Sequence, residues 1–262
     1  MKVDLKGKRA LITGASKGLG FAAAMSLAEC GATIFMCARN SDNLERSVQD
    51  IRSKTNAEVH YLPTDMSSNS GIDNLVKELR NQINGTDIVF ISGGHPPALS
   101  LSEAKDSDWN KAFCQVLSPA IRLTSEFVDE MKQNHYGRFI YISSIYAIEP
   151  EYSTIIQSTY RAALNSFSKC IASENAGYGI TANTICPGFF DTPLVERLSK
   201  EIASKNKRSS DDVINEWSNL SPYGKLGDPS DLGSYAAFLC SDMGKFINGR
   251  SHVIDGGAIK SY

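Results

Sequence analysis

The sequence contains no long apolar segment and no excess of charge of either sign. None of its apolar runs approaches the ~18 residues that a membrane-spanning helix needs, and the polar start Met1–Lys6 is not typical of a signal peptide. Its 27 basic and 29 acidic residues give a net charge of −2, which gives no electrostatic reason to expect binding to nucleic acid or to an anionic membrane. We therefore expect a soluble, cytoplasmic protein.

Closely spaced cysteines are also missing. No C-x-x-C pair occurs among the six cysteines, which are Cys30, Cys37, Cys114, Cys170, Cys186 and Cys240. Such scattered thiols favour reduced and mostly buried side chains over metal ligands, so no metal site is predicted. The sequence shows no internal repeat and no low-complexity linker. Its 262 residues, of which 42% are hydrophobic, are enough for one large α/β domain spanning 1–262.

A glycine-rich loop near the start of the chain is the most informative feature that is present. Thr13–Gly20 reads Thr-Gly-Ala-Ser-Lys-Gly-Leu-Gly and joins an apolar run of strand length, Arg9–Ile12, to the helix-favouring stretch Phe21–Cys30. Glycines let the backbone approach a pyrophosphate, and the helix start presents free N–H groups to it. We expect a dinucleotide here rather than a plain structural turn, bound by Gly14, Ser16, Lys17, Gly18, Leu19 and Gly20.

Two cations indicate which dinucleotide the loop binds. Ala32–Arg39 is predicted to be a second buried strand, and Arg39 stands at its carboxyl end, where α/β folds place ligand contacts. An acidic residue there would hydrogen-bond a ribose 2′-hydroxyl, whereas Arg39, together with Lys17, favours a 2′-phosphate. The sequence therefore predicts NADP(H) rather than NAD(H). The alternative is that both residues are solvated surface cations.

Strands and helices alternate along the rest of the chain. Further strands are predicted at Glu58–Asp65, Thr86–Gly94, Gly137–Ser144, within Gly179–Gly188, and at Ser251–Gly257. Helices are predicted at Ser41–Lys54, Ile72–Ile83, Asp108–Asn134, Thr154–Gly177 and Asp228–Asp242, and Pro119 predicts a kink or an early break. This alternation indicates a seven-stranded parallel sheet covered on both faces. The polar segment 189–220, from Phe189 to Leu220, is expected to be a mobile cover over the strand ends.

Several motifs, in order, resemble those of the short-chain dehydrogenase/reductase family over Leu5–Gly257. Thr13–Gly20 is similar to the family's glycine motif, and Asp65-Met66 to its adenine-contacting pair. Ser92-Gly93-Gly94 stands in place of its Asn-Asn-Ala-Gly segment. The stretch that holds the nicotinamide carboxamide is matched by Pro187, Gly188 and Thr192, with Phe190 between them.

The resemblance is greatest to 3-oxoacyl-carrier-protein reductases and to sugar or polyol dehydrogenases. It implies a single Rossmann-like, doubly wound domain with strand order 3-2-1-4-5-6-7. It also implies cofactor contacts from Asp65, Met66, Ser92, Gly93, Pro187, Gly188, Phe190 and Thr192. A homo-oligomer, either a dimer or a homotetramer built on the two long helices, is likewise implied.

The chain departs from the family at its catalytic residues. The family uses a Ser, a Tyr about thirteen residues later, and a Lys four residues after the Tyr, but no Tyr-x-x-x-Lys occurs here. Aligning Phe167-Ser168-Lys169 with the family's helix puts Gln157 at the Tyr position and Arg161 at the Lys position, with Ser144 retained. A family Asn seven residues after a Trp is replaced by Val116. The competing alignment takes Tyr160 as the catalytic residue, which puts Leu164 at the Lys position.

These replacements limit the chemistry that we expect. Glutamine can polarise a carbonyl together with Ser144, but it has no titratable proton for acid–base work, and loss of a positioned donor removes ~10²–10⁴-fold in rate. Arg161 retains a positive charge that can hold ribose hydroxyls. Other proton sources are water, the substrate, or one of Tyr146, Tyr152 and Tyr160; His95 is more typical of a polar loop residue.

We predict an NADP(H)-dependent oxidoreductase for a small-molecule carbonyl or alcohol substrate, with Ser144, Gln157 and Arg161 as the catalytic set. The last of these also binds the cofactor. The alternative is a dinucleotide-binding protein without dehydrogenase activity, acting as a sensor or a partner subunit.

Overall fold

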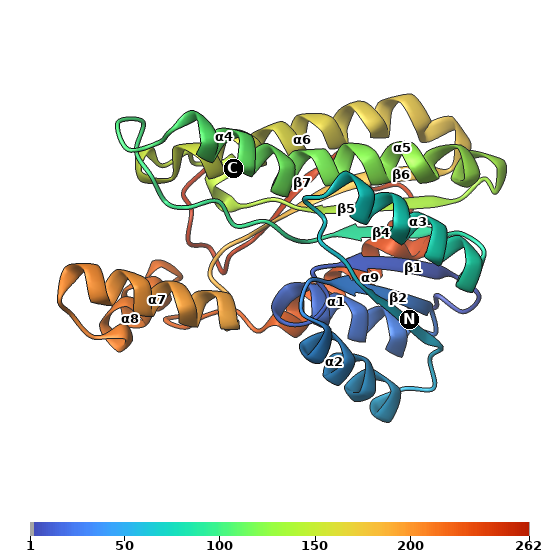
Figure 1. The fold of residues 1–262 in the computed structure, drawn as a ribbon, viewed down its shortest axis with the longest axis horizontal. Coiled ribbons are helices and arrows are strands. Elements are labelled where there is room, and N and C mark those ends of the chain that lie inside the picture. The colour runs from blue at the N-terminus through green and yellow to red at the C-terminus, as the bar shows by residue number, and fades with distance from the viewer. Residues whose placement is uncertain (1–2, 262) are drawn as a thin grey trace.

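The computed structural model describes residues 3–261, so the ends of the predicted 1–262 domain lie outside the described residues. Its centre is a seven-stranded sheet in which every neighbouring pair is parallel (Figure 1). The strands are β1 (Arg9–Thr13), β2 (Thr33–Ala38), β3 (Val59–Pro63), β4 (Ile88–Ile91), β5 (Gly137–Ile142), β6 (Ile180–Pro187) and β7 (Ser251–Ile254). Their order, β3-β2-β1-β4-β5-β6-β7, confirms the prediction. All carboxyl ends therefore lie at one edge of the sheet.

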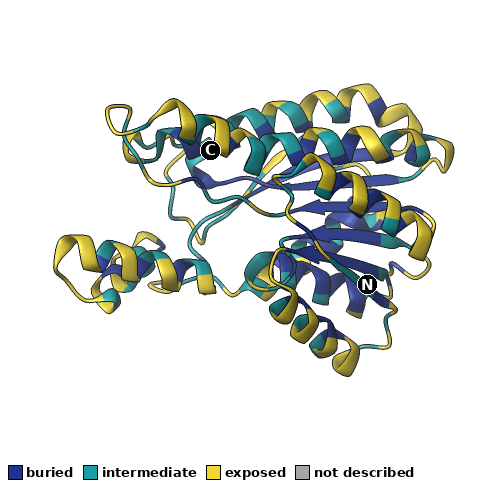
Figure 2. Ribbon diagram, viewed as in Figure 1, coloured by how far each residue is buried: buried dark blue, intermediate teal, exposed yellow. Residues whose placement is uncertain are grey.

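Helices cover both faces of this sheet (Figure 1). One face carries α1 (Gly18–Glu29), α2 (Ser41–Lys54) and α9 (Pro229–Cys240), and the other carries α3 (Asn69–Ile83), α5 (Ser118–Gln133) and α6 (Ile155–Asn175). Successive strand residues point to opposite faces. Accordingly, Ile12 of β1 packs into the first layer and Leu11 into the second, and both are fully buried. The five inner strands are buried almost throughout, the edge strands β3 and β7 only partly, and the outer helix faces are exposed (Figure 2).

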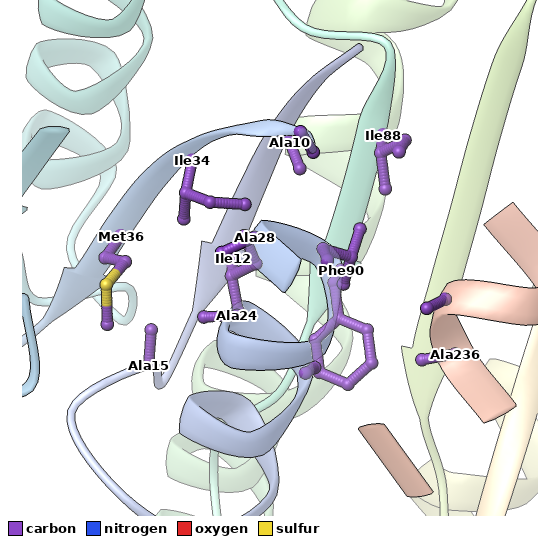
Figure 3. Close-up of a cluster of buried hydrophobic side chains, with 14 of the residues drawn as sticks. Ala10, Ile12, Ala15, Ala24, Ala28, Ile34, Met36, Ile88, Phe90 and Ala236 are labelled. Carbon is purple, nitrogen blue, oxygen red and sulfur yellow. The ribbon is translucent and has the colours of Figure 1, made fainter. Parts of the chain in front are cut away.

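Small side chains bring the first helical layer close to the sheet. Ala24 and Ala28 of α1 lie over Ile12 and beside Phe90 of β4 (Figure 3). Helix α9 crosses α1 at Gly233, where a Cβ would lie 2.5 Å from the carbonyl oxygen of Ala22. Because α1 is held on two sides, the glycine loop at its amino end has a fixed position.

The predicted helix Asp108–Asn134 is present as one unbroken helical run over 106–133, but its middle is a π-helix. Helix α4 covers Asp106–Ala112, a π-helix covers Phe113–Leu117, and α5 follows from Ser118. Pro119 lies in the first turn of α5, where its missing N–H group breaks no hydrogen bond. The early break that Pro119 predicted is absent, and a wider π turn lies just before this residue.

The segment 189–220, predicted to be a cover over the strand ends, is mostly helical. It forms α7 (Pro193–Asn206) and α8 (Ser210–Leu220), which project beyond the carboxyl edge of the sheet (Figure 1). The Thr192 side chain caps α7 by accepting from the amide of Val195, and Ser209 caps α8. These side-chain caps stabilise the first turns of two helices that contain few apolar residues.

Smaller differences concern strand ends and cysteines. The strand predicted to reach Asp65 ends at Pro63, and the last strand ends at Ile254. Cys37, Cys186 and Cys240 are buried as expected, but Cys170 is exposed. Within residues 3–261, no group of three or more His, Cys, Asp or Glu side chains is arranged to hold a metal ion. No helix in that range has both the length and the apolar character needed to cross a membrane.

Candidate active site

The glycine loop between β1 and α1 packs against the end of β4. The Thr13 hydroxyl donates to the Ser92 carbonyl at 2.8 Å and accepts from the Ser92 amide at 3.0 Å. A Cβ at Gly14 would lie 2.4 Å from the Ser92 carbonyl oxygen, and one at Gly20 would lie 2.5 Å from the Gly14 carbonyl oxygen. Neither position has room for a side chain. The loop is therefore bare backbone that a ligand can approach closely.

The start of α1 is open to an anion. Helix α1 begins at Gly18, with no side-chain hydrogen bond from its N-cap Lys17 and no acidic residue in its first turn. Its first N–H groups and its positive dipole end are thus not neutralised by a neighbouring side chain. Lys17 is exposed, and a Cβ at Gly18 would touch the Thr192 side chain at 3.4 Å. The loop thus lies beside the start of α7. The Ser16 carbonyl accepts a hydrogen bond from the Ser47 hydroxyl at 2.8 Å, which fixes this part of the loop against α2.

Arg39 and Asp65 lie after adjacent strands, β2 and β3. The Asp65 carboxylate accepts hydrogen bonds from the amide and the hydroxyl of Ser67, at 3.0 and 2.8 Å. These bonds, and to a smaller extent the positive charge of Arg39, hold the pKa of Asp65 below its usual value. Arg39 is exposed and forms no ion pair among the described residues. Met66 contacts the buried thiol of Cys37, with 3.8 Å between the sulfurs.

The other expected cofactor residues lie at the ends of β4 and β6. Gly93 has a φ of 157° and no heavy atom within 4 Å of where its Cβ would stand, so its face is open. Pro187 ends β6, and the amide of Gly188 donates to the Ile254 carbonyl. Phe190 is 4% exposed and packs over Gly227, so its side chain belongs to the core and only its backbone is available to a ligand.

Arg161 connects the carboxyl ends of β4 and β5. It is 7% exposed, and its guanidinium donates to the Ile142 carbonyl at 2.5 Å, to Gly93 at 3.2 Å and to Gly94 at 2.5 Å. Its Nε is buried without a partner. Burial lowers the pKa of Arg161 to about 10, which leaves the group charged at neutral pH. Most of its donors are thus engaged by backbone carbonyls rather than free for a ribose.

Ser144 and Gln157 both adjoin Arg161, because the neighbouring Ser143 hydroxyl donates to the Arg161 carbonyl at 3.0 Å and Gln157 precedes Arg161 by one helical turn. Ser144 follows the end of β5 and is 6% exposed; its hydroxyl oxygen accepts from the Tyr146 amide at 3.2 Å, so its own proton remains available. Gln157 lies one turn before Arg161 on the same face of α6 and is 8% exposed. Within residues 3–261 its amide has no hydrogen-bond partner. Its amide nitrogen and oxygen are not among the fully buried polar atoms of the described residues, so solvent or a ligand can reach them.

Tyr160 and Leu164, the pair in the competing alignment, face away from these residues. The Tyr160 hydroxyl donates to the Trp109 carbonyl at 3.1 Å, and its ring packs against Trp109 and Phe113. Leu164 is 2% exposed and belongs to the core between α6 and the sheet. Val116, at the position of the family Asn, is buried in the same core.

The surroundings of His95 could not be predicted from its neighbours in the chain. Burial, and then the positive charges of Arg161 and Arg197, lower the pKa of His95 to about 4. No hydrogen bond to its imidazole exists within residues 3–261. The proximity of Arg197, which belongs to α7, could not be inferred from spacing along the chain.

These residues fit a phosphorylated dinucleotide. The bare loop, the uncapped start of α1 and the open face of Gly93 follow one edge of the sheet. Glycine is required by close packing at Gly14 and Gly20, and by a positive φ of 61° at Gly14 and 58° at Gly18. The unpaired Arg39 lies at the end of the neighbouring strand, where the adenosine half of a dinucleotide would lie.

Comparisons with known proteins agree with this geometry. The family model described as enoyl-(acyl carrier protein) reductase matches residues 14–258. The 3-oxoacyl-[acyl-carrier-protein] reductase FabG of Escherichia coli (strain K12) is 30% identical over 255 residues, which cover 97% of this chain and 98% of that protein. The enzyme of the same name from Aquifex aeolicus (strain VF5) is 26% identical over 257 residues, covering 98% and 99%.

Two solved structures are similar over nearly the whole chain. L-sorbose reductase from Gluconobacter frateurii, complexed with NADPH and L-sorbose, superposes with a TM-score of 0.95 at 29% identity and full coverage of both chains. YwfH, an NADPH-dependent reductase involved in bacilysin biosynthesis, gives a TM-score of 0.89 at 29% identity, covering 97% of this chain and 99% of that one. The fold, the glycine loop and these matches together show that the chain belongs to the short-chain dehydrogenase/reductase family.

Proposed function

We propose that this chain is an NADP(H)-dependent reductase of a small carbonyl compound. Two features together support the proposal. The glycine loop is open to a nucleotide, and the Gln157 amide, which forms no hydrogen bond among the described residues, lies one helical turn from Arg161. Relatives over the whole chain are reductases, and the sorbose reductase and YwfH are described as NADPH enzymes.

The cofactor would lie along the carboxyl edge of the sheet. Its pyrophosphate would meet the glycine loop and the start of α1, and the adenosine 2′-phosphate would meet Arg39 and Lys17. When bound, NADPH supplies the hydride. Thr192 and the backbone of Gly188 would hold the nicotinamide end, and Asp65 and Met66 the adenine.

Ser144 and Gln157 would act on the carbonyl oxygen of the substrate. Both can donate a hydrogen bond to this oxygen, and donors fixed in a water-poor site stabilise the negative charge that develops there. Neither gives up a proton near neutral pH, so the proton that completes the alcohol comes from water. Arg161 would be a positioning residue, because it fixes the Gly93 backbone and adds positive charge to the site.

The proposal predicts a reaction that depends little on pH. We expect the purified chain to oxidise NADPH in the presence of activated ketones or aldehydes, with kcat nearly constant between about pH 6 and pH 8. Gln157 has no ionisation in this range, and the pKa of His95 lies at about 4. The measurement is the loss of NADPH absorbance at several pH values. A step in this range would reveal a titrating proton donor and contradict the roles given to Ser144 and Gln157.

Cofactor preference should depend on Arg39. Replacing Arg39 by Asp is expected to weaken NADPH binding by ~10–100-fold, because charge-assisted hydrogen bonds of ~1.5–3 kcal/mol to the 2′-phosphate are lost. Binding of NADH should change far less. Fluorescence titration with both nucleotides measures the ratio of affinities. The matched control is Lys54→Asp, which makes the same charge change at the far end of α2; an equal effect of both substitutions would refute a specific phosphate contact.

A dinucleotide-binding protein without turnover is the second candidate. It is favoured by the Tyr160 hydroxyl, which donates to the Trp109 carbonyl, and by Tyr152, whose side chain is 81% exposed. Binding of NADPH with no consumption of it by any carbonyl compound would support this second function.

A further inference from the structure

The segment that follows β7, Asp255–Ser261, returns to the loop that carries Ser144. One carboxylate oxygen of Glu149, Oε1, accepts three hydrogen bonds from it: from the amide of Lys260 at 2.7 Å, and from the amide and the hydroxyl of Ser261 at 2.5 and 2.8 Å. Hydrogen bonds to an ionised carboxylate are stronger than those between neutral groups. The bonds from Ser261, and then the bond from Lys260, hold the pKa of Glu149 below its usual value, so the carboxylate is charged at neutral pH.

Glu149 stands at the end of the tight turn that begins at Ser144. The Ser144 carbonyl accepts from the amide of Ala147 at 3.0 Å. The amide of Glu149 itself donates to the Ile145 carbonyl at 2.9 Å. The Ser144 hydroxyl accepts from the amide of Tyr146, within the same turn, at 3.2 Å. The hydroxyl proposed to act on the substrate and the Glu149 carboxylate therefore belong to one hydrogen-bonded unit.

The other end of the 255–261 segment is fixed at the carboxyl edge of the sheet. Asp255 follows β7, and its carboxylate accepts from the amide of Ile259 at 2.8 Å. A Cβ at Gly188 would lie 2.8 Å from the Cβ of Asp255, so the segment starts in close contact with the end of β6. The Ser221 hydroxyl, at the end of α8, donates to the Gly256 carbonyl at 2.9 Å. The segment thus connects the Ser144 turn to β6 and to the cover segment.

We propose that Glu149 is a positioning residue: by binding the 255–261 segment, it holds the Ser144 hydroxyl where the carbonyl oxygen of the substrate is polarised. The inference rests on the proposed reductase function and adds a residue to it. Glu149 acts through Ser144 and takes no part in bond making. Without its carboxylate, the turn keeps its internal hydrogen bonds but loses its link to the segment. The Ser144 hydroxyl then spends less time in the productive position, and a displacement of ~1 Å can cost ~10²-fold in rate.

Glu149→Ala removes all three hydrogen bonds. We expect it to lower kcat for the reduction of an activated ketone by about 10-fold, part of the full cost of a misplaced group. The dissociation constant of NADPH should stay unchanged, because the glycine loop is built on β1 and α1. Glu149→Gln keeps an oxygen acceptor and should recover part of the lost rate. The matched control is Glu151→Ala, which removes a carboxylate of the same loop that accepts from the Ser153 hydroxyl at 3.4 Å.

A second pair of variants changes the donor instead of the acceptor. Lys260→Pro removes the amide N–H that binds Glu149, whereas Lys260→Ala removes only the side chain. The proline variant alone should lower kcat. In the double variant Glu149→Ala, Lys260→Pro the two losses should not add, because both substitutions break the same link. Additive losses would show that Glu149 acts by another route and would overturn the inference.

Hydrogen exchange separates this inference from the reductase function. Mass spectrometry of peptides covering 144–149 and 255–261 measures how often their amides open. We expect faster exchange in both peptides for Glu149→Ala and unchanged exchange for Glu151→Ala. Unchanged exchange over 144–149, or unchanged kcat in Glu149→Ala, would overturn the positioning role and leave the reductase standing. If the unaltered chain reduces no carbonyl compound, the reductase function fails, and the exchange measurement alone decides whether Glu149 holds the turn.

Discussion

The double substitution Gln157→Tyr, Arg161→Lys is expected to raise NADPH-dependent ketone reduction by ~10²–10⁴-fold, the usual contribution of a positioned proton donor. Residues 157 and 161 lie on one face of α6, so a phenol and an ammonium would stand one turn apart beside Ser144. The ammonium lowers the pKa of the phenol and thereby makes it a better donor near neutral pH. A lysine can also hydrogen-bond the Gly93 and Gly94 carbonyls that Arg161 now contacts.

The matched control for this experiment is Gln157→Phe, Arg161→Lys. It has nearly the same shape as the first double variant but lacks the hydroxyl. Overpacking at residue 157, which is 8% exposed, costs ~1–3 kcal/mol in both variants and cancels from the comparison. Only the tyrosine variant should gain rate and acquire a pH-dependent kcat. Equal rates in the two variants would show that residue 157 does not contact the reacting oxygen.

The single variant Gln157→Tyr separates the roles of the two positions. If Arg161 stays bound to its three carbonyls, the phenol has no free cation beside it, and the gain in rate should be smaller than in the double variant. Activity only in the double variant would favour the second candidate function, a binding protein whose catalytic residues have been lost.

Gly20→Ala is expected to weaken NADPH binding by ~100-fold while leaving the protein folded. A Cβ at this position would lie 2.5 and 2.8 Å from the carbonyl oxygen and carbon of Gly14, and 3.0 Å from the Thr13 carbonyl oxygen. All three are backbone atoms of the loop that would hold the pyrophosphate, so the loop must move away. A shift that costs the ligand ~3 kcal/mol of lost contacts changes its affinity by about two orders of magnitude. Alanine's higher helix propensity, ~1 kcal/mol, offsets part of the strain in the free protein.

Gly177→Ala provides the control for this prediction. No heavy atom lies within 4 Å of a Cβ at Gly177, so we expect no change in NADPH affinity and less than ~0.5 kcal/mol in stability. Nucleotide fluorescence titration and thermal unfolding measure both quantities. Unchanged NADPH affinity in Gly20→Ala would rule out the glycine loop as the pyrophosphate site.

The sequence alone predicted the sheet and the position of the glycine loop. Both follow from local patterns, because apolar runs of strand length and glycines between a strand and a helix are readable without long-range information. The absence of Tyr-x-x-x-Lys is likewise a fact of spacing. Pro119 indicated a kink or a break, but the helical run is unbroken there, and the π turn just before it could not be predicted from local sequence.

Which groups meet at the catalytic edge was decided by the tertiary structure. Side-chain direction on α6 determines that Arg161 reaches the Gly93 and Gly94 carbonyls while Tyr160 turns to Trp109, and this direction depends on packing against the sheet. His95 and Arg197 lie far apart in the sequence, and only the tertiary structure lets the positive charge of Arg197 lower the pKa of His95. Local sequence patterns determine where helices and strands form. Long-range packing determines which charged groups share a low-dielectric site, and this decides the chemistry that the site can perform.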